Sequence, residues 1–392
     1  MNKSSYKVAI VSDLHCLYRG EKTPSGISHL YTNTPMKPIA RHPVYALLDL
    51  LEKNPSIRAD MLICPGDIAD KADEQGLVSG WEFLKKIRNG LDAEHLLSTI
   101  GNHDVDSRNN FKYPSGPFEM VRSFVNDFPV PKENEQVKYW SKHFVIIESN
   151  EAQVLIINTC HNHISEDGAR ESIITTDTLD EIKKEVERLT EKDFRFAFCH
   201  HHPVKHSNID LKYKDGDVIE NGDKLLQLLS ELRFQIVVHG HKHDPRIKLE
   251  HRLTVFAAGS FSSLQNIKEL GGDNCFHIVE LFPNKRYGVI KTWIYAPTRG
   301  WEQRSDREFP CETGFGSEKT AEELAEKFHD YYIKNNNPIV KFSEVVSIYP
   351  DVRYLIPEEQ KNLNYILKSK YNLSFVPELP DVPKLLIDLT NE

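Results

Sequence analysis

The sequence lacks long apolar runs, and no stretch approaches the ~18 consecutive apolar residues that a membrane-spanning helix needs. Residues 1–13 place lysines before a short apolar stretch, but Asp13 interrupts that stretch too early for a signal peptide. The six cysteines are scattered and form no Cys-x-x-Cys pair, which favours reduced thiols over a disulfide scaffold or a zinc knuckle. We therefore expect a cytoplasmic protein without a membrane-spanning segment.

Positive charge is also scarce. Lysine and arginine number 49 against 58 aspartate and glutamate residues, so the formal net charge is -9. This balance disfavours binding along a nucleic-acid backbone, but it leaves that function open because bound divalent metals would reverse the charge locally. The length of 392 residues and the hydrophobic content of 39% predict one large domain with an appended part.

Histidine, by contrast, is abundant, with 18 residues. An apolar run in residues 234–244 ends in His239, His241 and His243. A buried strand explains the apolar residues, but core packing gives no reason for the histidines. Gly240 allows a tight turn, so imidazoles, which are the commonest metal ligands, can converge on one ion. For this stretch alone, a solvated polar loop is the alternative.

Four further predicted strands end in residues of the metal-binding type. The first leads to Asp13 and His15, which point to the same side of an extended chain because they are two positions apart. Residues 61–64 lead to a glycine and a carboxylate, residues 96–100 to an amide, a histidine and a carboxylate, and residues 194–199 to three consecutive histidines. Consecutive side chains splay apart, so these three cannot all bind one ion. The residues concerned are Asp67, Asn102, His103, Asp104, His200, His201 and His202.

Predicted helices alternate with these strands, an order that places the carboxyl ends of the strands at one edge of a sheet. Each motif alone is weak, but chance agreement of all five is remote. The pattern therefore predicts a metal centre at that edge. After another predicted strand, His161 and His163 are candidates for substrate contact, although a loop histidine is more often merely solvated.

Taken together, the motifs Asp-x-His, Gly-Asp, Gly-Asn-His-Asp, His and Gly-His-x-His resemble the pattern of the calcineurin-like metallophosphoesterase superfamily. The resemblance covers roughly residues 6–295. The segments Gly-Asp-Ile-Ala-Asp and His-His-His-Pro look like those of the class III cyclic-nucleotide phosphodiesterases. The family implies an α/β fold in which a two-sheet β-sandwich is flanked by helices. We expect residues 1–300 to form this catalytic domain and residues 301–392 to form a mostly helical C-terminal extension.

The resemblance also implies two divalent metal ions that share one carboxylate. Manganese, iron, zinc and cobalt all suit the ligand types, and manganese is the expected choice in vitro. Carried over position by position, the first ion is held by Asp13, His15, Asp67 and His243, and the second by Asp67, Asn102, His201 and His241. His201 is chosen because the family pattern His-x-Pro fits its register to Pro203, and His200 is the alternative. His103 is expected to stabilise or protonate the leaving oxygen, with Asp104 orienting its ring.

For function, the resemblance implies hydrolysis of a small nucleotide-type phosphodiester, such as a cyclic nucleotide, by a hydroxide that bridges the two metals. The alternatives are a DNA nuclease of the same superfamily and a phosphomonoesterase. A non-catalytic scaffold is disfavoured because no ligand residue is missing. The C-terminal extension is expected to pack on the main domain, to bind a protein partner or to mediate self-association.

Overall fold

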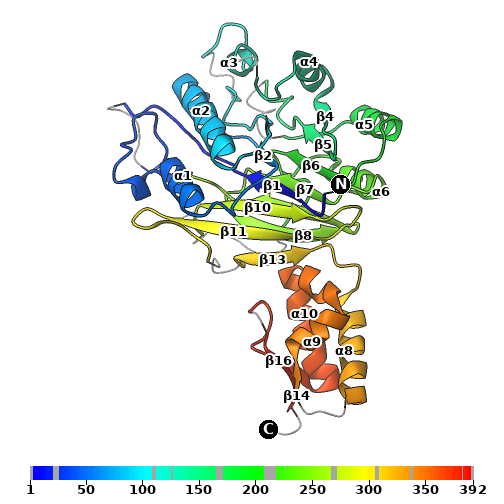
Figure 1. Cartoon of the computed structure of the whole chain (residues 1–392). Coiled ribbons are helices and arrows are strands. Elements are labelled where there is room, and N and C mark those ends of the chain that lie inside the picture. Colours follow the sequence, from blue (N-terminus) through cyan, green and yellow to red (C-terminus); the bar gives the residue numbers. More distant parts are fainter. Residues whose placement is uncertain are drawn as a thin grey trace.

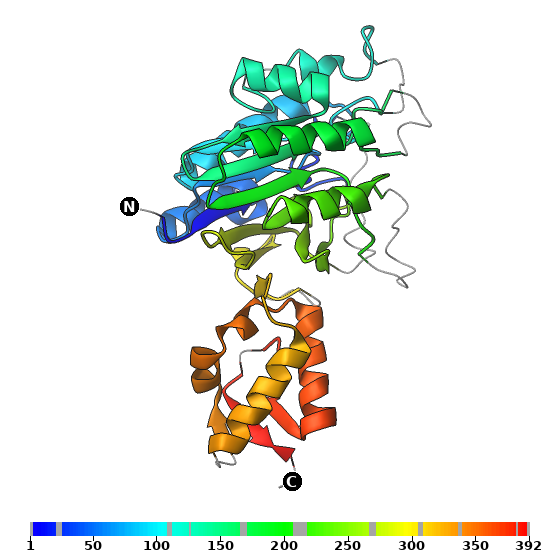
Figure 2. The same cartoon turned by 90° about the vertical axis from the view of Figure 1, so that its right-hand side faces the viewer.

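The computed structural model describes residues 3–20, 26–107, 112–124, 127–164, 171–206, 218–265, 272–304, 309–335, 339–381 and 383–389. Two β-sheets lie at the centre of the main body, and helices flank them (Figure 1). A smaller C-terminal part with its own sheet projects from one end of the molecule, as Figure 2 shows. None of the helices in the described ranges combines the length and the apolarity that crossing a membrane requires.

The first sheet has the strand order β12-β11-β10-β1-β2-β3, and β13 pairs with β11. Strands β1, β2 and β3 run parallel, whereas β10 is antiparallel to β1. The strands are β1 (Tyr6–Ile10), β2 (Met61–Cys64), β3 (His95–Ser98), β10 (Cys275–Leu281), β11 (Gly288–Ala296), β12 (Gly300–Glu302) and β13 (Glu312–Phe315).

The second sheet has the order β4-β5-β6-β7-β9-β8. Its four inner strands are parallel, and the edge strands β4 and β8 are antiparallel to their neighbours. The strands are β4 (Phe144–Glu148), β5 (Ala152–Ile157), β6 (Phe194–Cys199), β7 (Ile236–His239), β8 (Pro245–Glu250) and β9 (Leu253–Ala258).

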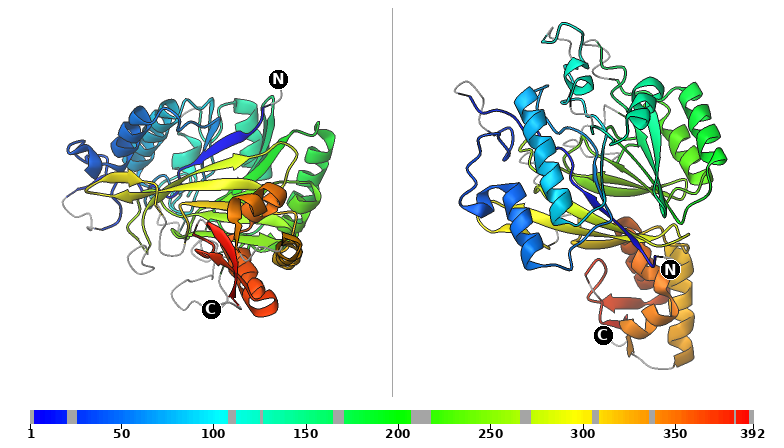
Figure 3. Two further views of the ribbon diagram at one scale, coloured as in Figure 1. Left: turned by 60° about the horizontal axis from the view of Figure 1, so that its bottom comes forward. Right: turned by 45° about the horizontal axis from the view of Figure 1, so that its top comes forward.

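Helices on opposite sides of the two sheets complete the main body (Figure 3). The helices of this body are α1 (Pro43–Lys53), α2 (Glu74–Gly90), α3 (Glu119–Arg122), α4 (Glu133–Lys142), α5 (Thr176–Arg188) and α6 (Gly222–Glu231), preceded by the short 3-10 turn Ile39–Arg41.

Side chains alternate between two apolar layers along the inner strands, as the period of two requires. On β6, Phe196 and Phe198 lie in the large core that both sheets share. Ala197 and Cys199 on the same strand pack instead against the apolar faces of α5 and α6. Because both faces of β6 are covered, it is apolar along its whole length. The predicted two-sheet sandwich flanked by helices is thus confirmed.

The first sheet extends past residue 300, where the sequence predicted the main domain to end. Strand β12 and strand β13 both pair with β11, and β13 reaches Phe315. The charged composition of this stretch suggested a new domain. However, short strands such as β13 owe their position to backbone pairing, and they need no apolar run of their own.

The C-terminal part has its own apolar core, which includes Leu324, Phe328, Leu363 and Phe375. Its elements are α8 (Ala321–Asn335), β14 (Ile339–Lys341), α9 (Phe342–Ile348), the 3-10 turn Pro350–Tyr354, α10 (Pro357–Tyr371), β15 (Leu373–Val376) and β16 (Leu385–Asp388). The strands pair in the order β14-β16-β15. Within the described residues, α8, α9 and α10 are therefore followed by the antiparallel pair of β15 and β16, which is the arrangement of a winged helix-turn-helix module.

Candidate metal centre

The polar residues that follow five strands come together at one edge of the two sheets. Asp13 and His15 follow β1, and Asp67 follows β2; His241 and His243 follow β7. Asn102 follows β3, and three histidines follow β6. Strands β1, β2 and β3 are parallel to one another in the first sheet, and β6 is parallel to β7 in the second, so their carboxyl ends meet as the sequence predicted.

One group consists of Asp13, His15, Asp67 and His243, which are all buried and offer ligand atoms within 4.8 Å of one another. The Nε2 atoms of His15 and His243 lie 3.0 Å apart. His15 Nε2 lies 3.4 Å from Asp67 Oδ2, and His243 Nε2 lies 3.4 Å from Asp13 Oδ1. Two imidazoles and two carboxylates that face one buried point are a donor set for a divalent cation.

A second group surrounds the side-chain oxygen of Asn102. The Oδ1 atom of Asn102 lies 2.9 Å from His200 Nε2 and 2.9 Å from His241 Nδ1. The two ring nitrogens lie 3.3 Å apart. His200 Nε2 also lies 3.3 Å from Asp67 Oδ2, the same oxygen that faces His15 in the first group. A single carboxylate oxygen thus borders both groups.

His201 lies beside this second group, because His200, His201 and His241 offer ligand atoms within 4.8 Å of one another. Its Nδ1 lies 2.9 Å from Thr159 Oγ1 and 3.9 Å from Cys160 Sγ. Its ring remains a neighbour of His241, with 4.6 Å between the ring centroids. The sequence assigned His201 to the second ion by its register to Pro203, whereas the side chain that contacts Asn102 and Asp67 is that of His200.

Asp70 contacts residues of the site, although the sequence analysis did not assign it there. Its Oδ1 lies 2.8 Å from His103 Nδ1 and 3.1 Å from His15 Nδ1, and it accepts a hydrogen bond from Gln265 Nε2 at 3.3 Å. Burial raises the pKa of Asp70, but the hydrogen bonds from His103 and His15 outweigh burial and leave the pKa lowered. The available signal was its spacing of three residues from Asp67.

Asp104 was predicted to orient the His103 ring, but the carboxylate that contacts His103 Nδ1 is that of Asp70. The Asp104 carboxylate instead accepts hydrogen bonds from the backbone N–H groups of Gly101 and Ala69, each at 2.8 Å. It therefore ties together the two loops that carry Asn102 and Asp67. Burial alone lowers the pKa of His103, but the Asp67 and Asp70 carboxylates raise it above its ordinary value, which favours the protonated ring.

The backbone turns sharply at most of these ligand-type residues. Left-handed φ values of 46° to 74° occur at Asp13, His15, Asp67, His241 and His243. Such a conformation costs a residue other than glycine about 1–3 kcal/mol, and it persists where the surroundings enforce it, often at functional sites. Glycine permits the close approach of the loops, because a Cβ atom at Gly101 would collide with the Asp67 carboxylate.

A family model described as calcineurin-like phosphoesterase matches residues 6–245, which include every residue of the two groups. The chain belongs to the calcineurin-like phosphoesterases. The family that the motifs resembled is thereby confirmed, and so is the predicted class of enzyme, a metal-dependent phosphoric ester hydrolase. A second family model, described as wHTH-Calcineurin_assc, matches residues 313–369 of this phosphoesterase, which lie in its C-terminal part.

A structural comparison found solved structures that are similar to this calcineurin-like phosphoesterase at low sequence identity. PhoD has a TM-score of 0.50 and 9% identity, with 81% of this chain and 70% of PhoD covered. The purple acid phosphatase PPD1 from yellow lupin (Lupinus luteus) has a TM-score of 0.49 and 14% identity, and the match covers 80% of this chain and 54% of PPD1. A dimetal phosphatase from Danio rerio has a TM-score of 0.46 and 11% identity, and the match covers 75% of this chain and 100% of that phosphatase. The chain spans about half the length of the lupin enzyme. A search of curated proteins found no match.

Proposed function

We propose that this phosphoesterase hydrolyses a small nucleotide-type phosphodiester with two divalent cations. Asp13, His15, Asp67 and His243 would hold the first, and Asp67, Asn102, His200 and His241 the second. The observation that carries the proposal is the position of Asp67 Oδ2, which lies 3.4 Å from His15 Nε2 and 3.3 Å from His200 Nε2. One carboxylate can therefore serve two ions.

The ligand types of the two groups suit several divalent transition metals. Imidazole, carboxylate and amide oxygen together suit manganese, iron, zinc or cobalt, and we favour manganese for assays in vitro. When bound, such a pair of ions supplies a water nucleophile of low pKa and neutralises charge on the phosphoryl group.

His103 is the chain's own contribution to the departure of the leaving group. Its Nδ1 lies 2.8 Å from Asp70 Oδ1, so the proton on Nδ1 is held by that carboxylate and the Nε2 proton can pass to the leaving oxygen. The backbone N–H of His103 also donates to Asp67 Oδ1 at 2.7 Å, which fixes the residue beside the shared carboxylate. A delivered proton matters most when the leaving group is a poor one, such as the sugar hydroxyl of a nucleotide ester.

The proposal is tested with purified protein and manganese on a panel of cyclic nucleotides, dinucleotides, nucleoside monophosphates, and single- and double-stranded DNA. We expect the highest kcat/KM on a small diester. Preferential cleavage of DNA would indicate the nuclease alternative, and preferential release of phosphate from monophosphates would indicate a phosphomonoesterase.

His200 and His201 should differ in their effect on metal content. Because His200 contacts Asn102 and Asp67 while His201 contacts Thr159 and Cys160, we expect His200→Ala grown with manganese to lose about one ion per chain and most activity. The matched variant His201→Ala should keep both manganese ions. Metal analysis with a diester assay checks this, and the reverse result would restore the register assignment from Pro203.

Metal binding should release a proton from His200. Burial lowers the pKa of this ring, but the nearby Asp67 and Asp13 carboxylates raise it to about 9 in the metal-free chain. An incoming ion must displace that proton, so affinity for the second ion should rise up to about tenfold per pH unit below the raised pKa. Calorimetric titration in buffers of different ionisation enthalpy counts the protons. Unchanged proton release in His200→Asn would contradict this account.

For the C-terminal part we propose partner binding. Of the eleven large apolar side chains that are exposed in the described ranges, five lie here: Ile333, Ile339, Ile348, Tyr365 and Val376. They suit contact with a protein partner or with a second copy of the chain. We place the protein in the cytoplasm, because the six cysteines are scattered along the sequence and form no Cys-x-x-Cys pair, which favours reduced thiols.

A further inference from the structure

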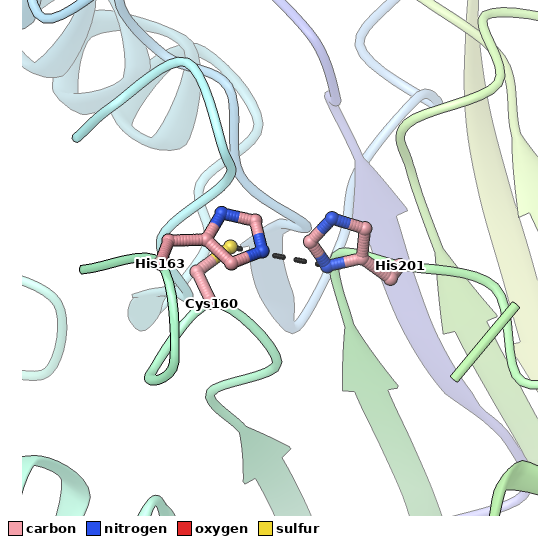
Figure 4. Close-up of side chains that lie close together, drawn as sticks. All are labelled: Cys160, His163 and His201. Carbon is pink, nitrogen blue, oxygen red and sulfur yellow. Dashed lines mark hydrogen bonds between the residues drawn. The ribbon is translucent and has the colours of Figure 1, made fainter. Parts of the chain in front are cut away.

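A second donor cluster, built from Cys160, His163 and His201, lies beside the proposed dinuclear centre. Cys160 and His163 belong to the loop after β5, and His201 follows β6. All three side chains are buried, and their ligand atoms lie within 4.8 Å of one another. Figure 4 shows the sulfur and nitrogen atoms of the three side chains facing one another.

We propose that Cys160, His163 and His201 bind a third divalent cation of the zinc type. It would be separate from the two ions of the dinuclear centre, since it shares none of the side chains proposed to hold them. Thiolate and imidazole are the ligands that zinc prefers in proteins, whereas manganese prefers oxygen. Three protein ligands leave a fourth tetrahedral position open.

The spacing of the donors is close to what a zinc ion needs. Zinc–sulfur and zinc–nitrogen bonds of about 2.3 and 2.0–2.1 Å at a tetrahedral angle place the two ligand atoms roughly 3.6 Å apart. Cys160 Sγ and His201 Nδ1 lie 3.9 Å apart. An inward movement of a few tenths of an ångström, which side-chain rotation can provide, brings this pair into coordination distance.

Hydrogen bonds of all three ligands would be exchanged on binding, among them the one that the Cys160 thiol donates to the Ile100 carbonyl at 3.6 Å. The Thr159 hydroxyl lies 2.9 Å from His201 Nδ1, whose single ring lone pair the ion would need, so this hydroxyl has to move aside on binding; it also accepts the His201 backbone N–H at 3.1 Å. His163 Nε2 lies 3.2 Å from the Glu171 carbonyl, and His163 Nδ1 has no hydrogen-bond partner among the described residues. The His163 proton can move to Nδ1 and leave Nε2 for the ion.

Binding would replace the thiol proton of Cys160 by the metal, so the site gains one negative charge as the cation enters. That charge partly offsets repulsion from the neighbouring second ion, whose proposed ligand His241 has its ring centroid 4.6 Å from that of His201. The bound ion would also connect the loop after β5 to the end of β6. It would thereby hold His201 against the centre.

Metal content and spectroscopy of the full chain test the proposal. We expect about two ions per chain after reconstitution with manganese and about three with zinc or cobalt. Cobalt bound to a thiolate gives a sulfur-to-metal charge-transfer band in the near ultraviolet, and the dinuclear centre has no sulfur ligand to produce one. The wild-type chain should show the band, and Cys160→Ser should lose both the band and one equivalent of cobalt.

The matched control is Cys199→Ser, because Cys199 is also buried and donates to the His201 carbonyl at 3.2 Å without belonging to the cluster. It should keep the band and the third ion. Zinc X-ray absorption of the wild-type chain, which needs no variant, should show a sulfur neighbour at about 2.3 Å. Absence of sulfur from that spectrum, or persistence of the band in Cys160→Ser, overturns the proposal.

Discussion

Asp67→Asn is expected to remove both ions of the dinuclear centre and to abolish phosphoester hydrolysis. The Oδ2 atom of Asp67 faces His15 of the first group and His200 of the second, so the loss of one negative charge weakens both positions at once. The decrease should exceed the ~10²- to 10³-fold that follows the removal of a single oxyanion-stabilising donor. Metal analysis together with kcat on a diester measures it.

Asp60 provides the matched control for this variant. It lies at the opposite end of β2 and accepts a hydrogen bond from the Lys7 backbone N–H at 2.7 Å. Asp60→Asn removes a negative charge from the other flank of the same strand, so it reports general destabilisation and should keep both ions. A second comparison is Asn102→Ala, which should weaken mainly the second ion. Two firmly bound manganese ions in Asp67→Asn would mean that another group bridges them.

The five strand ends could be predicted because each combines an apolar run with polar residues that core packing cannot use. The apolar residues of a buried strand such as β7 predict the position of that strand, and histidines at its end and just beyond it stand out from the apolar pattern. Since parallel strands end at one edge, the meeting of these residues followed from the order of strands and helices. The family resemblance then supplied the pairing of ligands with ions.

The directions in which His200, His201 and His202 point could not be read from the sequence. Consecutive side chains after a strand point in different directions, and the direction of each depends on the exact twist of the chain at that point. The left-handed φ of 52° at Asp67 is likewise enforced by tertiary contacts, such as the approach of Gly101, that no local sequence pattern reveals.

Asp70 and β13 illustrate a second limit of sequence reasoning. Asp70 matters because His15 and His103, from two other loops, both approach its Oδ1. Strand β13 exists because β11 offers a free edge with which residues Glu312–Phe315 can pair. In both cases the partner lies far away in the sequence, so the local composition around Asp70 or β13 does little to predict the contact.

His103→Ala is expected to impair hydrolysis of a nucleotide diester by about 10²- to 10⁴-fold and to leave hydrolysis of bis(nitrophenyl) phosphate much less affected. A sugar hydroxyl is a poor leaving group that needs a proton, whereas a nitrophenolate departs without one. The ring of His103 is oriented by Asp70, while its backbone N–H donates to Asp67 Oδ1 at 2.7 Å and remains in the alanine variant. Metal content should therefore stay near that of the wild type.

The comparison of the two substrates separates proton delivery from simple positioning. If His103 delivers the proton, the ratio of kcat on the nucleotide diester to kcat on the nitrophenyl ester falls in His103→Ala, and His103→Gln, which keeps a polar side chain of similar reach, does not restore it. If His103 only holds Asp70 and the loop that carries Asn102, both substrates lose activity equally and the glutamine variant recovers part of it. Equal losses with unchanged metal content would therefore exclude His103 as the general acid, because the leaving group would no longer determine how much the ring contributes.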